Sequence, residues 1–174
     1  MMGNNAPTSA TLNGVALSTF VKMPGPFDRC GWYYSYLAAP TSGTFQINFS
    51  GSTYADYIVM TLQDAAQSNP NDASAVNNGV NTSITVSTTT SVGSDLLLSM
   101  GARIVDGFTT YGSGQTSIST LNDSTGLGYL AATSKTSSSS PGTVSASGGE
   151  GDSVDTDWTI LAITAFSTES ESRE

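Results

Sequence analysis

Polar and apolar side chains alternate, residue by residue, over much of this chain. In residues 44–50, Phe45, Ile47 and Phe49 take every second position between polar neighbours. Successive side chains of a β-strand point to opposite faces, so a period of two predicts a strand with one buried face. By alternation or by β-branched content, further strands are predicted at 9–12, 15–21, 31–39, 54–62, 82–89, 95–105, 126–133, 142–147 and 154–166. A helical period is almost absent, with one helical turn expected near 63–68, so we expect an all-β fold.

Turn residues separate the predicted strands. Asn13-Gly14 lies between apolar residues and predicts a tight hairpin, because both residues tolerate the positive φ of a two-residue turn. Residues 40–43 (PTSG) predict a second turn, which would pair 31–39 with 44–49. Longer loops are predicted in the polar or glycine-rich segments 67–79, 135–142 and 148–152. Roughly eight to ten short strands joined in this way predict an antiparallel β-sandwich, with a barrel as the alternative.

The chain has the length of a single domain. Its 174 residues contain no internal repeat and no boundary between two domains. We expect residues 1–167 to form one β-sandwich and 168–174 to form a polar, acidic tail. The predicted core gathers large apolar side chains from several strands into one cluster: Phe45, Ile47, Phe49, Leu96, Leu98, Trp158 and Ile160.

The composition excludes several kinds of active site. The chain has no histidine and a single cysteine, Cys30. These counts rule out Ser-His-Asp and Cys-His catalysis, imidazole metal sites, an internal disulfide and a structural zinc site. Without histidine, we expect no titration switch near neutral pH. Paired carboxylates remain as an acid–base option but lack a supporting motif, so we expect no enzyme activity and no cofactor.

The charge is negative and concentrated near the end of the sequence. The net charge is −9, and residues 150–174 contribute −6 of it, with seven acids and one base. Nucleic acids are bound by clustered Lys and Arg, which this chain lacks, so we expect no nucleic-acid partner. Apolar runs such as 160–163 are far shorter than the ~18 residues of a membrane span, so no membrane insertion is expected. Residues 1–5 lack the features of a signal peptide, which predicts either another route or a sequence that begins after processing.

The order of these features resembles a known family. After the Asn13-Gly14 hairpin come a Trp/Tyr strand, YLAAPTSGTFQINF at 36–49, a D-x-x-x-x-N-P-N-D-A loop, a Thr-rich strand, DLLLSM at 95–100 and WTILAITAF at 158–166. This order is similar to that of jelly-roll-like β-sandwich domains, which recur in bacteriophage structural proteins and in surface proteins of microbes. Family members carry an apolar strand before the Asn-Gly hairpin. Residues 1–8 do not supply one, so the resemblance implies an open sheet edge there.

Aromatic side chains are the main candidates for ligand or partner contacts. They lie on the predicted strand 31–39 and in the predicted loop 106–112: Tyr33, Tyr34, Tyr36, Phe108 and Tyr111. Aromatic rings suit both sugar faces and protein interfaces. The strand carries aromatics on both faces, which favours a core on one side and a subunit interface on the other. We expect Phe108 and Tyr111 to be exposed, because loop tips are exposed.

An acidic cluster near the end of the sequence is the candidate for a cation site. It consists of Glu150, Asp152, Asp155 and Asp157, whose oxygens are of the kind that Ca²⁺ binds. Their spacing matches no established calcium loop, so a solvated acidic loop is favoured and no metal is expected.

The favoured function is that of a non-catalytic structural subunit in a virion or extracellular assembly. A phage-type decoration, fibre or capsid-associated protein would fit the resemblance, with copies of itself or other assembly proteins as partners. The alternative is a carbohydrate-binding or adhesive surface module with glycan partners, and a third reading is a subunit of a cellular surface filament. All three readings place the protein on a virion or an extracellular surface.

Overall fold

The computed structural model describes residues 7–22, 31–34, 42–52, 57–62, 65, 70–103, 107–122 and 129–164. The elements are β1 (Pro7–Leu12), β2 (Val15–Ala16), β3 (Ser18–Lys22), β4 (Gly31–Tyr34), β5 (Phe45–Phe49), β6 (Asn71–Thr90), β7 (Leu96–Arg103), β8 (Thr110–Tyr111), β9 (Thr116–Asn122), β10 (Tyr129–Thr136) and β11 (Gly142–Ile163). All their pairings are antiparallel. The described residues contain no helix, and hence no helix that could cross a membrane. The predicted all-β, antiparallel β-sandwich is confirmed.

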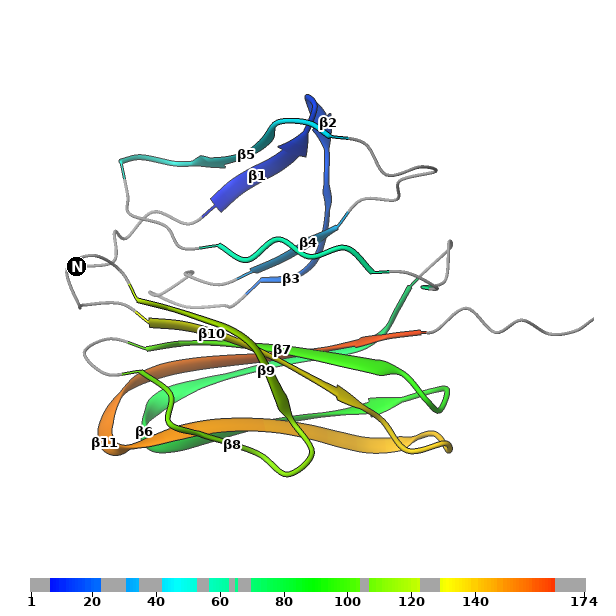
Figure 1. Cartoon of the computed structure of the whole chain (residues 1–174), viewed down its shortest axis with the longest axis vertical. Coiled ribbons are helices and arrows are strands. Elements are labelled where there is room, and N and C mark those ends of the chain that lie inside the picture. The colour runs from blue at the N-terminus through cyan, green and yellow to red at the C-terminus, as the bar shows by residue number, and fades with distance from the viewer. Residues whose placement is uncertain are drawn as a thin grey trace, which may run out of the picture.

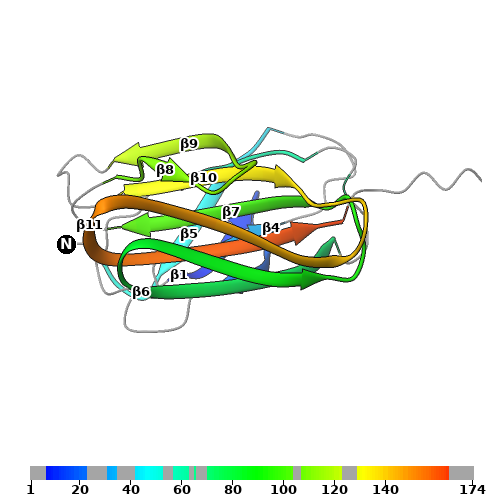
Figure 2. The ribbon, with the colours of Figure 1, turned by 90° about the horizontal axis from the view of Figure 1, so that it is seen from below.

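The main sheet is built on a long ribbon that folds back on itself. Its strand order is β6-β11-β7-β10-β9, with β8 pairing β11. β6 and β11 pair along almost their whole length, and their register shifts between Gly149 and Val154. There the ribbon bends, as the left side of Figure 2 shows. The first limb of β11 (142–149) pairs with β8 and the second limb (154–163) pairs with β7, so one sheet supplies two layers.

Two predicted loops are strands instead. Residues 71–79 belong to β6, and residues 148–152 belong to β11. Both segments are polar or glycine-rich, and such residues are typical of loops, so the sequence pattern did not predict strands there. Their pairing with each other and with neighbouring strands overrides the low β-propensity of these residues. Most of the predicted helical turn at 63–68 lies outside the described residues.

The apolar residues form two cores, on opposite faces of the layer that contains β7. The inner core lies between the two limbs of the ribbon and contains Ile84, Val86, Leu97, Ala146, Trp158, Ile160 and Ala162. The outer core contains Leu98, Met100, Ala102, Leu130, Leu161 and Ile163. The prediction of one core is therefore wrong, because Leu98 and Trp158 belong to different faces of the same layer. Phe45, Ile47 and Phe49 are only half-buried and lie on a separate sheet.

That separate sheet has the order β2-β1-β5, and β3 pairs with β4 beside it. Both lie on one side of the main sheet in Figure 1. The hairpin at Asn13-Gly14 is confirmed, with φ of 51° and 78° and with Leu12 opposite Val15. The predicted pairing of 31–39 with 44–49 is wrong, since β4 pairs with β3 and β5 pairs with β1.

Asn13 explains why β5 lies beside β1. Its backbone N–H donates to the carbonyl of Thr44, and its Oδ1 accepts from the N–H of Thr44, both at 2.9 Å. A Cβ at Gly43 would lie 2.0 Å from the Asn13 side chain, so a larger residue there would displace the Asn13 amide from Thr44. β1 pairs with β5 along its length but with β2 only at Thr11 and Leu12, so the open edge expected before the Asn-Gly hairpin stays a prediction.

Candidate functional site

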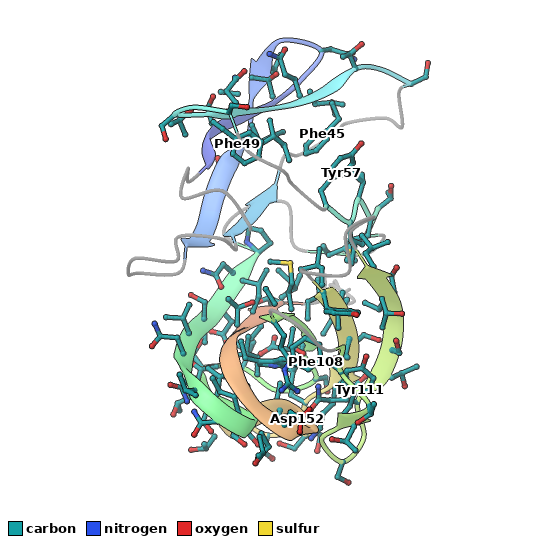
Figure 3. All side chains as sticks on the ribbon, turned by 90° about the vertical axis from the view of Figure 1, so that its left-hand side faces the viewer. Phe45, Phe49, Tyr57, Phe108, Tyr111 and Asp152 are labelled. Carbon is teal, nitrogen blue, oxygen red and sulfur yellow. The ribbon has the colours of Figure 1, made fainter. Side chains whose placement is uncertain are left out.

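Phe108 and Tyr111 face the inner core rather than solvent. The Phe108 ring centroid lies 4.8 Å from that of Trp158 in an edge-to-face contact, and the Tyr111 ring lies 6.3 Å from Trp158. Figure 3 shows Phe108 enclosed by the curl of the ribbon. The expected exposure of these two residues is wrong, because the pairing of β8 with β11 turns their segment against the sandwich.

A buried arginine completes this aromatic cluster. Arg103 is 1% exposed, and its guanidinium carbon lies 5.5 Å from the centroid of the Phe108 ring, within cation–π range. Its Nη2 donates to the backbone carbonyl of Asp152 at 2.7 Å. Four further polar atoms of the cluster have no hydrogen-bond partner: Nε and Nη1 of Arg103, the Tyr111 hydroxyl and the Trp158 Nε1. The cluster therefore carries several unsatisfied donors inside an apolar core.

The other candidate residues are placed less completely. Tyr33 and Tyr34 lie on β4, opposite residues of β3, and their side chains fall outside the described set. Tyr36 lies outside the described residues. Their role as ligand or interface contacts stays a prediction.

The acidic segment 150–157 lies on β11 around its bend. The side chain of Asp152 is exposed, whereas those of Glu150, Asp155 and Asp157 fall outside the described set. Among the side chains that are described, no three Asp, Glu or Cys residues gather as metal ligands. Asp152 instead contributes its backbone carbonyl to Arg103.

A pair of carboxyl groups lies where β6 and β7 begin. Asp95 is fully buried, and its carboxyl group hydrogen-bonds that of Asp72 through a shared proton, with no other partner at its oxygens. Asp72 is held by hydrogen bonds to the β6–β7 turn: its Oδ2 accepts from the N–H groups of Ser91 at 2.7 Å and Val92 at 3.3 Å. Its Oδ1 accepts from the Ser91 hydroxyl.

The two carboxyl groups shift each other's pKa in opposite directions. Burial, together with the carboxyl group of Asp72, raises the pKa of Asp95 to about 6. Burial would also raise the pKa of Asp72, but the hydrogen bonds from Ser91 and Val92 outweigh it and lower that pKa. The raised pKa brings this buried carboxyl group closer to neutral pH than the absence of histidine alone would suggest. No sequence signal marks the pair, because the two residues come from separate strands with unremarkable neighbours.

The strand predicted at 54–62 is not found in the described residues 57–62, which form no regular element and alternate between exposed and half-buried side chains up to Thr61. Ile58 and Met60 pack against the outer core, whereas Tyr57 and Val59 are 59% and 65% exposed. The Tyr57 ring also contacts that of Phe45, at 5.8 Å between centroids. In Figures 1 and 3 this segment lies between the β2-β1-β5 sheet and the main sheet. Among the described residues, none forms a β-ladder with 57–62.

Comparison with known proteins identifies no relative of this chain. The sequence matches no family model, and no curated protein or solved structure is significantly similar to it. The resemblance to jelly-roll-like domains of phage and microbial surface proteins thus stays a prediction.

Proposed function

We propose that this protein is a non-catalytic structural subunit of a virion or extracellular assembly, and that it joins its neighbours through segment 57–62. The observation that carries this proposal is that segment 57–62 pairs with no strand among the described residues and has exposed apolar side chains. An unpaired strand offers a row of N–H and C=O groups to a strand of another chain. Strand addition of this kind obtains its affinity from main-chain hydrogen bonds and its specificity from alternate side chains.

The exposed side chains of this segment suit an interface. Tyr57 and Val59 project on the same side, and Leu62 is 36% exposed at the end of the segment. Aromatic and apolar residues are enriched at the centre of protein interfaces, where they lose contact with water. The partners we propose are copies of this chain or other subunits of the assembly, such as a phage-type decoration, fibre or capsid-associated complex.

The carbohydrate-binding alternative receives less support. Sugar stacking needs aromatic faces that a ligand can reach, and Phe108 and Tyr111 pack on Trp158. A cellular surface filament would use the same segment and differs from the favoured proposal only in the identity of the assembly.

The proposal is tested by replacing Val59 with lysine in the full chain. Light scattering over a concentration series should show wild-type oligomers, and Val59→Lys should shift them to monomers because a charge would be buried at the interface. Val80→Lys is the matched control, since Val80 is 64% exposed on β6, away from the segment. A strictly monomeric wild type, or an equal effect of both substitutions, would contradict the proposal.

A further inference from the structure

We propose that Asp72 and Asp95 form a proton-operated latch, which holds one end of the sandwich closed in mild acid and loosens it at neutral pH. The latch joins the start of β6 to the β6–β7 turn (residues 91–94). It lies at the end of the ribbon opposite the bend, where the first and last residues of β6 meet the two ends of β11. It is separate from segment 57–62, and the proposed assembly does not require it.

Asp72 fastens the β6–β7 turn to the start of its own strand. Its Oδ2 accepts from the N–H groups of Ser91 at 2.7 Å and Val92 at 3.3 Å, and its Oδ1 accepts from the Ser91 hydroxyl. Burial would raise the pKa of Asp72, but these hydrogen bonds outweigh it and hold that pKa below its usual value. Asp72 is therefore the ionised member of the pair.

Asp95 supplies the proton of the latch. It is fully buried directly before β7, and its carboxyl group hydrogen-bonds that of Asp72. An ionised carboxylate only accepts hydrogen bonds, so two carboxyl groups bond each other only while one of them is protonated. Because Asp72 holds the charge, Asp95 is the neutral donor.

The backbone beside Asp95 is fixed to the β10–β11 turn (residues 137–141). The Ser137 hydroxyl accepts from the Asp95 N–H at 2.8 Å, and the Ser137 N–H donates to the Asp95 carbonyl at 2.9 Å. The N–H of Ser94 donates to the carbonyl of Ser138 at 2.7 Å. The shared proton thus completes a series of hydrogen bonds that runs from the start of β6 through both turns.

No described basic side chain would replace the proton when it leaves. Neither turn contains a titratable residue. Arg103 lies at the opposite end of β7, where its guanidinium contacts Phe108. Lys135 on β10 runs towards Gly114, where a Cβ would lie 3.9 Å from its Nζ. Within the described part of the chain, the charged group that faces Asp95 is Asp72.

Loss of the proton turns this attraction into repulsion. Burial, the hydrogen bond to Asp72 and the charge of Asp72 raise the pKa of Asp95 to about 6. When the end opens, this pKa returns towards its ordinary value of 3.8, so opening releases a proton at intermediate pH. Opening therefore becomes easier as the pH rises from about 4 to about 6, and its free energy then stays constant.

Hydrogen–deuterium exchange of the full chain at pH 4.5, 5.5 and 7 tests the latch at the amides of Ser91 and Val92. Their protection factors, which correct for the direct effect of pH on exchange, report local opening. In the wild type they should fall about twenty-fold between pH 4.5 and 7, as expected for a pKa that differs by about two units between the closed and open states.

Asp95→Asn is the decisive variant, because its side-chain N–H donates to Asp72 at every pH. Both amides should then stay protected at pH 7. Asp152→Asn removes an exposed acid at the bend and is the matched control, which should keep the pH dependence of the wild type. An equal fall in Asp95→Asn and wild type would overturn the proposal, because other groups would then control the opening.

Carbon-13 NMR of the side-chain carboxyl groups gives a second readout that needs no variant. We expect Asp95 to titrate near pH 6 and Asp72 below its ordinary 3.8. Wild-type protection that does not change between pH 4.5 and 7, or an Asp95 that titrates like an exposed aspartate, would also overturn the latch.

Discussion

Asp95 is a carboxyl group placed where a protein would normally put a neutral or paired side chain. Burial, the hydrogen bond to the Asp72 carboxyl group and the charge of that group raise its pKa to about 6. A fold tolerates the cost of such a group only if its other contacts outweigh it. A single residue thus makes the stability of the sandwich sensitive to conditions that its composition does not suggest.

The stability of the protein should depend on pH through Asp95. Its pKa is about 6 in the folded state against 3.8 ordinarily, so the folded state binds this proton more tightly. The contribution is fully present below pH 4, is lost as the pH rises to 6, and then stays constant. The loss amounts to at most about 3 kcal/mol in the free energy of unfolding.

Urea unfolding in EDTA at pH 4.5, 5.5, 6.5 and 7.5 measures this dependence. Asp95→Asn should flatten the decline between pH 4.5 and 6.5, whereas Asp152→Asn should retain it. A decline of the same size in Asp95→Asn would assign the effect to other groups.

At the scale of elements, β11 stands out because one strand serves both layers of the sandwich. Its bend brings Gly148 of the first limb over Trp158 of the second limb. Gly101 of β7 lies directly opposite Trp158 in the ladder. A Cβ at Gly101 or Gly148 would lie 2.0 Å or 2.2 Å from the indole ring, so the two glycines make the space that Trp158 fills.

Replacing Gly148 with alanine should therefore destabilise the protein by about 1–3 kcal/mol, because an added methyl group overpacks a filled core. Gly142→Ala is the matched control on the same strand, since no atom lies within 4 Å of a Cβ at Gly142. Urea midpoints of the two variants check the prediction. Equal midpoints would show that Trp158 can move aside without cost.

Local features of these elements are predictable from the sequence, and their partners are not. The Asn13-Gly14 turn follows from two adjacent residues that accept positive φ. The pairing of β5 with β1 depends on the contact between Asn13 and Thr44, 31 residues apart, which no local pattern signals. Gly148 predicts a loop by its type, but it pairs with Ile84 and Tyr111 as a strand residue, and its missing side chain leaves room for Trp158.

For the candidate sites too, local features are predictable from the sequence, whereas tertiary contacts are not. The alternation in 57–62 is visible in the sequence, but its missing ladder is a tertiary property. The sequence identifies Phe108 and Tyr111 as candidate contact residues. The pairing of β8 with β11 determines that their side chains face the inner core. Asp72 and Asp95 come together only because β6 and β7 start at the same end of the sheet.

For the whole molecule, the important arrangement is a layer with an apolar core on each face. β7 is buried on both sides, so its sequence is almost continuously apolar where a surface strand would alternate. Leu97 points into the inner core and Leu98 into the outer core. The segment 57–62 covers part of the outer core with its half-buried Ile58 and Met60.

Truncation of adjacent leucines tests this arrangement. Leu97→Ala and Leu98→Ala should each lower the free energy of unfolding by about 2–5 kcal/mol, because each removes a fully buried side chain. Ile118→Ala on β9, where the side chain is 42% exposed, should have a much smaller effect. If the outer face were open to water, Leu98→Ala would resemble Ile118→Ala in urea unfolding.

The long ribbon also determines when the protein can fold. In the main sheet β6 has β11 as its ladder partner, and even their nearest paired residues, Thr90 and Gly142, are 52 positions apart. Contacts between residues so far apart in the sequence form only after a large loss of chain entropy. We therefore expect the protein to fold in milliseconds to seconds. During synthesis, β6 leaves the ribosome well before its partner does. The sandwich can close only after β11 has been made, and until then β6 remains an unpaired strand.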